Sequence, residues 1–141
     1  MKVSSFAVAR PAYYDRNATS SFVSYSGDVA PHGDTLRATF TTAAGKKAYI
    51  ETGVVYIRQS SGASVINRSL AVLRIVSGTD TNDVARIDSL SSATSSTSRT
   101  DKLAGQPTIY AGETLTIRTL DLSTGGTLDF NIGAKITSFD A

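Results

Sequence analysis

The 141-residue chain lacks cysteine and tryptophan, and its only histidine is His32. Without cysteine there are no disulfides, no thiolate catalysis and no cysteine-ligated metals. A single histidine also rules out the histidine clusters that usually hold zinc. The sequence therefore predicts no metal site and no cofactor.

Long apolar runs are missing as well. No segment approaches the ~20 apolar residues that a membrane-spanning helix needs. Arg10 and Pro11 end the first apolar stretch before the core of a signal peptide could form. We expect no membrane partner and a retained N-terminus, and the lack of cysteine fits a reducing compartment. The net charge is only +2 and the nine arginines are spread along the chain, so no nucleic-acid partner is expected either.

What the chain has in excess is Ser and Thr, 19 and 18 residues respectively. Helix-favouring residues are scarce, with 2 Glu, 5 Lys, 2 Gln and 1 Met. Thr, Val, Ile and Tyr suit a pleated surface, whereas Ser, Asp and Gly suit turns. This composition predicts an all-β protein.

Alternation of apolar and polar residues locates the strands from residue 35 onward. Leu36, Ala38 and Phe40 mark a half-buried strand, and residues 70–76 are apolar on both faces, as in a central strand. Further strands are expected at 47–59 (with a bulge or bend at Gly53), 84–90, 108–110, 113–122 (with a bulge near Arg118 and Thr119) and 128–136. A Ser/Thr-rich surface loop is expected at 91–100, and a hairpin turn at 123–126. Seven or eight short strands predict one sandwich or barrel over residues 35–141.

Residues 1–34 differ from the rest, because they hold five aromatic side chains and no clean periodicity. One interpretation is a leading strand of the domain with loops. The other, which we adopt as the expectation, is an extended arm that docks on a neighbouring subunit or surface. The partner-contact residues predicted on this basis are Phe6, Arg10, Tyr13, Tyr14, Arg16, Phe22 and Tyr25.

No constellation of residues points to catalysis. Glu51 and Glu113 lie beside turns or strand ends, and most Asp residues flank turn-forming residues, where they satisfy the backbone. Glycine-rich phosphate loops are absent. The sequence therefore predicts no catalytic residue, and we expect a protein that is not an enzyme.

Residues 107–117 (PTIYAGETLTI), residues 122–127 and the strand ending at Phe139 resemble the closing hairpin of small jelly-roll proteins from tailed-phage virions. The Cys-free, Ser/Thr/Gly/Ala-rich composition also resembles phage head decoration (cement) proteins. The resemblance implies a jelly roll of about 7–8 strands, made in the host cytoplasm and located on the capsid surface of the virion. It implies as partners the major capsid protein or another virion protein, together with copies of the chain itself in a homotrimer.

A carbohydrate-binding or receptor-binding β-sandwich of the fibre or lectin type is the alternative. Sugar sites favour a stacked Trp or Tyr with Asp or Asn nearby. The chain has six Tyr but no Trp, and the Tyr are divided between residues 1–34 and the strands.

Overall fold

The computed structural model describes residues 17–28, 33–61, 69–88, 98–121 and 127–141, and these form strands and turns with no helix. The strands in chain order are β1 (Thr19–Asp28), β2 (Gly33–Thr41), β3 (Lys46–Ser61), β4 (Ser69–Ser77), β5 (Asp80–Asp88), β6 (Ser98–Lys102), β7 (Thr108–Ile109), β8 (Thr114–Asp121) and β9 (Thr127–Asp140).

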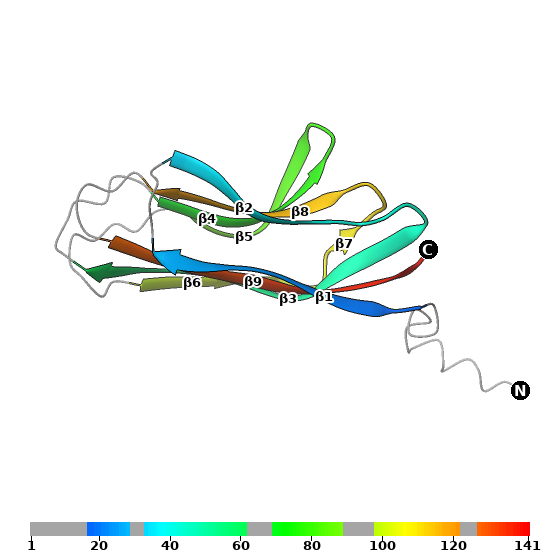
Figure 1. Ribbon diagram of the computed structural model, residues 1–141, viewed down its shortest axis with the longest axis horizontal. Coiled ribbons are helices and arrows are strands. Elements are labelled where there is room, and N and C mark those ends of the chain that lie inside the picture. Colours follow the sequence, from blue (N-terminus) through cyan, green and yellow to red (C-terminus); the bar gives the residue numbers. More distant parts are fainter. Residues whose placement is uncertain (1–16, 29–32, 62–68, 89–97, 122–126) are drawn as a thin grey trace, which may run out of the picture.

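The strands form two antiparallel sheets stacked face to face (Figure 1). Sheet A has the order β1-β9-β3-β6, with β7 beside β3, and sheet B has the order β2-β8-β4-β5. Each early strand pairs with a late one in reverse order: β1 with β9, β2 with β8, β3 with β6 and β4 with β5. A two-stranded ribbon wound in this way is a jelly roll, so the predicted fold class is confirmed.

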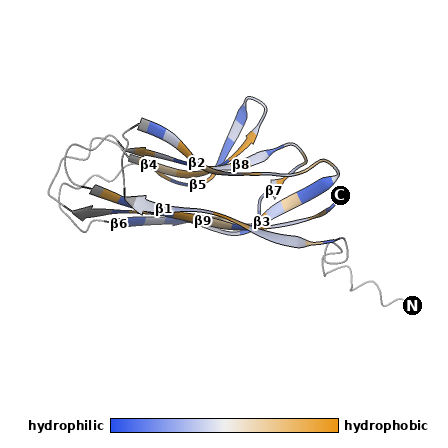
Figure 2. Cartoon of the chain, in the orientation of Figure 1, coloured by the Kyte–Doolittle hydropathy of each residue, from blue (hydrophilic) through white to orange (hydrophobic). Residues whose placement is uncertain are grey.

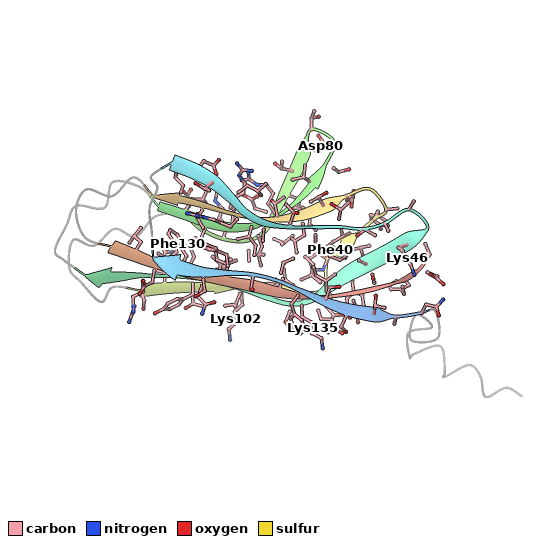
Figure 3. The ribbon with its side chains drawn as sticks, in the orientation of Figure 1. Phe40, Lys46, Asp80, Lys102, Phe130 and Lys135 are labelled. Atoms are coloured by element: carbon pink, nitrogen blue, oxygen red, sulfur yellow. The ribbon has the colours of Figure 1, made fainter. Side chains whose placement is uncertain are left out.

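The core lies between the two sheets and contains the inward-facing residues of both. In β9, alternate residues from Leu128 to Ile136 are buried, as the period of two predicts. Figure 2 shows orange, hydrophobic stretches in both layers, and Figure 3 shows Phe40 and Phe130 between them. In β4, Leu73 faces this core while Val72 is buried on the opposite face, which confirms a central strand covered on both sides.

The expected hairpin between the last two strands is wrong. β8 pairs with β2 and β4 in sheet B, whereas β9 pairs with β1 and β3 in sheet A. The connection therefore crosses from one sheet to the other, although residues 122–126 themselves lie outside the described part. A turn signal predicts that the chain reverses but not which neighbour the next strand joins.

The bulge expected in β8 lies instead in the strand beside it. β8 keeps a regular register with β4, while β2 shifts register between Leu36 and Ala38. The extra residue, Arg37, turns inward, and Leu36 faces outward with 48% of its surface exposed. The expected inward position of Leu36 is thus wrong, because a bulge reverses the alternation of side chains.

The bulge expected at Gly53 lies elsewhere in β3. The register shift in β3 falls two residues earlier, between Ile50 and Thr52. A Cβ atom on Gly53 would stand 2.9 Å from Cδ1 of Leu73 in the opposite sheet. Gly53 therefore makes room for Leu73.

Of the Ser/Thr-rich segment at 91–100, the structure describes the last three residues. Residues 98–102 form β6, which pairs with β3, so the expected loop is wrong for its last three residues. Residues 89–97 lie outside the described part.

Within residues 1–34, the structure contains a leading strand. All ten residues of β1 pair with β9, and Val23 belongs to the core. Residues 1–16 lie outside the described part, so an arm remains a prediction for them alone.

Candidate functional site

Two of the seven predicted contact residues, Phe22 and Tyr25, lie within the described part of the chain. Phe6, Arg10, Tyr13, Tyr14 and Arg16 lie outside it.

Phe22 and Tyr25 both belong to β1 but point to opposite faces of sheet A, as residues three apart on a strand must. Tyr25 packs against the core between the sheets. Phe22 lies on the outer face with 73% of its surface exposed. The structure therefore does not bring the two side chains together, and Phe22 is the more exposed of the two.

Beside Phe22, the outer face of sheet A is hollowed by a groove of about 630 Å³. We call it the Gly133 groove. It is lined by Phe22, Ser24, Val54, Lys102, Gly133 and Lys135, which belong to four neighbouring strands.

Strand register explains how these residues meet. Gly133 of β9 lies between its direct neighbours Ser24 of β1 and Val54 of β3. Lys102 of the edge strand β6 pairs with Val54 and continues this row. Phe22 and Lys135 face each other in the next row. The groove thus runs across the strands. Because Gly133 has no side chain, its position forms part of the floor of the groove.

Lys135 is held in place at the groove by the bulge of β3. Its Nζ atom lies 3.0 Å from Oε2 of Glu51, the extra residue at the bulge, and Tyr49 Oη donates a hydrogen bond to Glu51 Oε1. The hydrogen bond from Lys135 is the largest effect that lowers the pKa of Glu51, whereas burial opposes it. Glu51 is therefore ionised at neutral pH and fixes the position of the Lys135 ammonium group.

Lys102 differs from Lys135, because no carboxylate within the described ranges forms an ion pair with it. Figure 3 shows both lysines projecting from sheet A, away from sheet B. The groove consequently combines an exposed aromatic ring with positive charge.

The outer face of sheet B is the second candidate surface. Its apolar floor is formed by Leu70, Val72 and Leu120. Val72 pairs with Arg118 on one side and Arg86 on the other, and it is fully buried. Long arginine side chains cover apolar surface in this way while their charged ends stay in water.

The charges on that face neutralise one another. Three arginines form ion pairs with three aspartates: Arg74 with Asp83, Arg86 with Asp83 and Asp88, and Arg118 with Asp34. The pKa of Asp83 is lowered, first by the hydrogen bond from Arg74, and burial opposes this shift. Sheet B therefore presents a face whose charges are already satisfied.

The third candidate surface is a hollow of about 540 Å³ beside the projecting β4–β5 hairpin. Asp80, Asn82, Gln106, Tyr110 and Glu113 are among its lining residues. Glu113 is engaged in its own turn, because its Oε1 atom accepts a hydrogen bond from the Tyr110 backbone amide. Its lining thus offers carboxylate, amide and phenol groups.

Among the residues described, no three His, Asp or Glu side chains gather where they could hold a metal ion. Nor does this part of the chain contain a helix long and apolar enough to cross a membrane.

No protein-family model matches the chain, and no curated protein is similar to it in sequence. Among solved structures, similarity is found to a chain of infectious bursal disease virus Gx strain, with a TM-score of 0.49 and 11% identity. That match covers 88% of this chain and 32% of the viral chain. The corresponding values for the Gt strain of the same virus are a TM-score of 0.40, 11% identity, and 89% and 33% coverage.

Eiger TNF from S. frugiperda is similar over 82% of this chain and 64% of its own, with a TM-score of 0.34 and 13% identity. The present chain spans about a third of the length of the two viral chains. Similarity this low says nothing about what the chain binds.

Proposed function

We propose that this chain is a non-enzymatic structural protein of a virion, and specifically that it decorates the outer surface of a tailed-phage head. Its partner is the major capsid protein or another virion protein. Support comes from the jelly-roll topology together with the resemblance of the composition to that of head decoration proteins.

The observation that carries the proposal is the exposure of Phe22. Five of the nine described residues of β1 upstream of Asp28 are Ser or Thr, and among them Phe22 presents a large apolar side chain to solvent. β1 pairs with β9 along its whole length, so binding at Phe22 requires little ordering of the backbone. Aromatic side chains on pre-ordered surfaces are frequent centres of protein interfaces.

Two further parts of the proposal concern assembly. Residues 1–16, with Phe6, Tyr13 and Tyr14, extend the contact beyond Phe22 as an arm. The chain acts as a homotrimer, because three linked contacts raise the affinity for a repetitive shell without any new chemistry.

The test is co-sedimentation with purified shells of the virus that encodes the chain. The proposal expects saturable binding at a fixed ratio to the major capsid protein, with three copies at each site. Absence of binding to shells would contradict the decorating role. A monomer bound at single sites would contradict the homotrimer. A major capsid gene next to the gene of this chain would support the same conclusion.

The polar hollow beside the β4–β5 hairpin favours the second candidate function, a carbohydrate-binding or receptor-binding module. It combines a carboxylate and an amide, Asp80 and Asn82, with a tyrosine, Tyr110. Binding on a glycan array that is lost in Asn82→Ala, without any binding to shells, would favour this function over decoration.

A further inference from the structure

The outer face of sheet A carries a glycine, Gly133, whose backbone conformation does not require glycine. The positive-φ glycines in the described segments are Gly45, Gly78, Gly105 and Gly112, so Gly133 has a conformation open to any residue. A Cβ atom there would meet only ordinary contacts, 3.6 Å from the Val23 carbonyl oxygen and 3.8 Å from Ser24 Cβ. Glycine inside a strand weakens it, since no side chain packs there.

Gly53 and Gly133 differ in what occupies the space that a side chain would fill. Gly53 gives space to Leu73, a residue of this chain, whereas no described side chain fills the space above Gly133. What the glycine provides is the groove itself. A glycine inside a strand often marks a place where a ligand or another backbone approaches closely.

Shape and charge together define what the groove accepts. It crosses four strands, a width of roughly 14 Å at the usual strand spacing, and its volume is about 630 Å³. The Phe22 ring and Val54 offer apolar contact. Lys102 and Lys135 flank the groove, and Lys102 forms no ion pair with a described carboxylate. An apolar group therefore fits the floor, and a carboxylate fits beside Lys102, since Lys135 is already paired with Glu51.

From this geometry we infer that the Gly133 groove binds a segment of a partner protein that presents one large apolar side chain next to a carboxylate. The segment lies across the strands, from β1 toward β6, and does not add a strand to the sheet edge. This inference rests on the proposed function in one respect, since it takes the partner to be a protein of the shell.

The experiment is an NMR titration of ¹⁵N-labelled protein with three end-blocked tripeptides: Glu-Phe-Glu, Gln-Phe-Gln and Glu-Ala-Glu. Glu-Phe-Glu is expected to shift the amide signals of Ser24, Val54, Lys102 and Gly133. Each of the other two peptides is expected to bind at least threefold more weakly, because it lacks either the charge or the aromatic ring. Shifts confined to other surfaces, or equal binding of all three peptides, would overturn the inference.

Gly133→Val fills the groove, and Asn131→Val is its control. Asn131 lies on the same strand and the same face but outside the Gly133 groove. Binding of Glu-Phe-Glu is expected to be lost in Gly133→Val and kept in Asn131→Val, with far-UV CD spectra that match the wild type. Full binding by folded Gly133→Val would overturn the inference.

A charge reversal keeps the test decisive if Gly133→Val fails to fold. Lys102 is exposed on an edge strand, so Lys102→Glu leaves the core intact. This variant is expected to bind Glu-Phe-Glu at least threefold more weakly and Lys-Phe-Lys more strongly than the wild type does. Unchanged preference between the two peptides would overturn the inference.

The peptide titration and the sedimentation assay can fail separately. Groove-specific peptide binding without shell binding contradicts the proposed function alone. Shell binding without any peptide binding at the groove contradicts this inference alone.

Discussion

The guanidinium carbon of Arg37 lies 4.5 Å from the centroid of the Tyr25 ring, so a cation of sheet B stacks on an aromatic side chain of sheet A. Arg37 Nε also donates a hydrogen bond of 2.9 Å to Thr119 Oγ1. Tyr25 belongs to β1, an edge strand of sheet A, and Arg37 belongs to β2, an edge strand of sheet B. The bulge in β2 therefore directs Arg37 inward, where it links the two sheets along one open side of the sandwich.

Replacing Arg37 should destabilise the fold. Arg37→Ala is expected to lower the free energy of unfolding by about 1–3 kcal/mol, because the cation–π contact and the hydrogen bond to Thr119 are both lost. Urea unfolding measures this change. Arg58→Ala is the control, because Arg58 forms an exposed ion pair with Asp129, and exposed pairs contribute at most about 1 kcal/mol. Equal losses in the two variants would show that Arg37 does not link the sheets.

Gly53 and Gly133 of sheet A should respond in opposite ways to an added methyl group. Gly53→Ala is expected to cost about 1–3 kcal/mol, since its Cβ would approach buried Leu73 too closely. Gly133→Ala is expected to be neutral or to stabilise the protein by up to about 1 kcal/mol, because the unfolded chain loses freedom. Thermal unfolding compares the two variants. A large loss in Gly133→Ala would contradict the open space above Gly133.

Acid should weaken the charge network on sheet B. The pKa of Asp83 is lower in the folded protein, chiefly through the hydrogen bond from Arg74. A depressed folded pKa means that Asp83 contributes its full stability above the ordinary aspartate pKa of about 3.9. That contribution is lost as the pH falls through the lowered folded value.

Asp83→Asn tests this pH dependence. We expect the variant to be less stable than the wild type by about 1–2 kcal/mol at pH 7, with a difference that narrows below about pH 4. Unfolding by urea from pH 7 to pH 2.5 measures it. Asp80→Asn, at the tip of the β4–β5 hairpin, is the control and should follow the wild-type profile. A difference that stays constant down to pH 2.5 would refute the assignment.

Phe22 should dominate binding to the shell. Burying a phenylalanine side chain contributes about 1.5–3 kcal/mol, so Phe22→Ser is expected to weaken binding about 10- to 100-fold per site. Leu36→Ser is the matched control, because Leu36 is an exposed apolar residue on the outer face of sheet B. Affinity for shells, measured by co-sedimentation, should be unchanged in that control. Equal loss in both variants would exclude a contact confined to sheet A.

The sequence predicted the fold best where one strand carries one regular pattern. The alternation from Leu128 to Ile136 and the two-sided apolar stretch of β4 both correspond to the structure, because burial on one or both faces leaves a direct signature. Residues that break the alternation were misplaced. Leu36 and Arg37 exchange faces at a bulge that depends on pairing with β8, which local sequence does not encode.

The site was only partly predictable for the same reason. Phe22 could be named from the excess of aromatic residues near the N-terminus, yet Tyr25 was grouped with it although it faces the core. Gly133 and Lys102 were missed, because nothing in the sequence brings residues 31 positions apart onto one surface. A glycine in an otherwise regular alternating strand was the one local signal for the groove.

A cryo-EM map of shells decorated with this protein tests the central claim most directly, because it shows which face of the sandwich meets the shell. The account predicts that the outer face of sheet A lies against the shell, with Phe22 buried and density entering the groove above Gly133. Contact through the outer face of sheet B or through the β4–β5 hairpin, with Phe22 left in solvent, would contradict it.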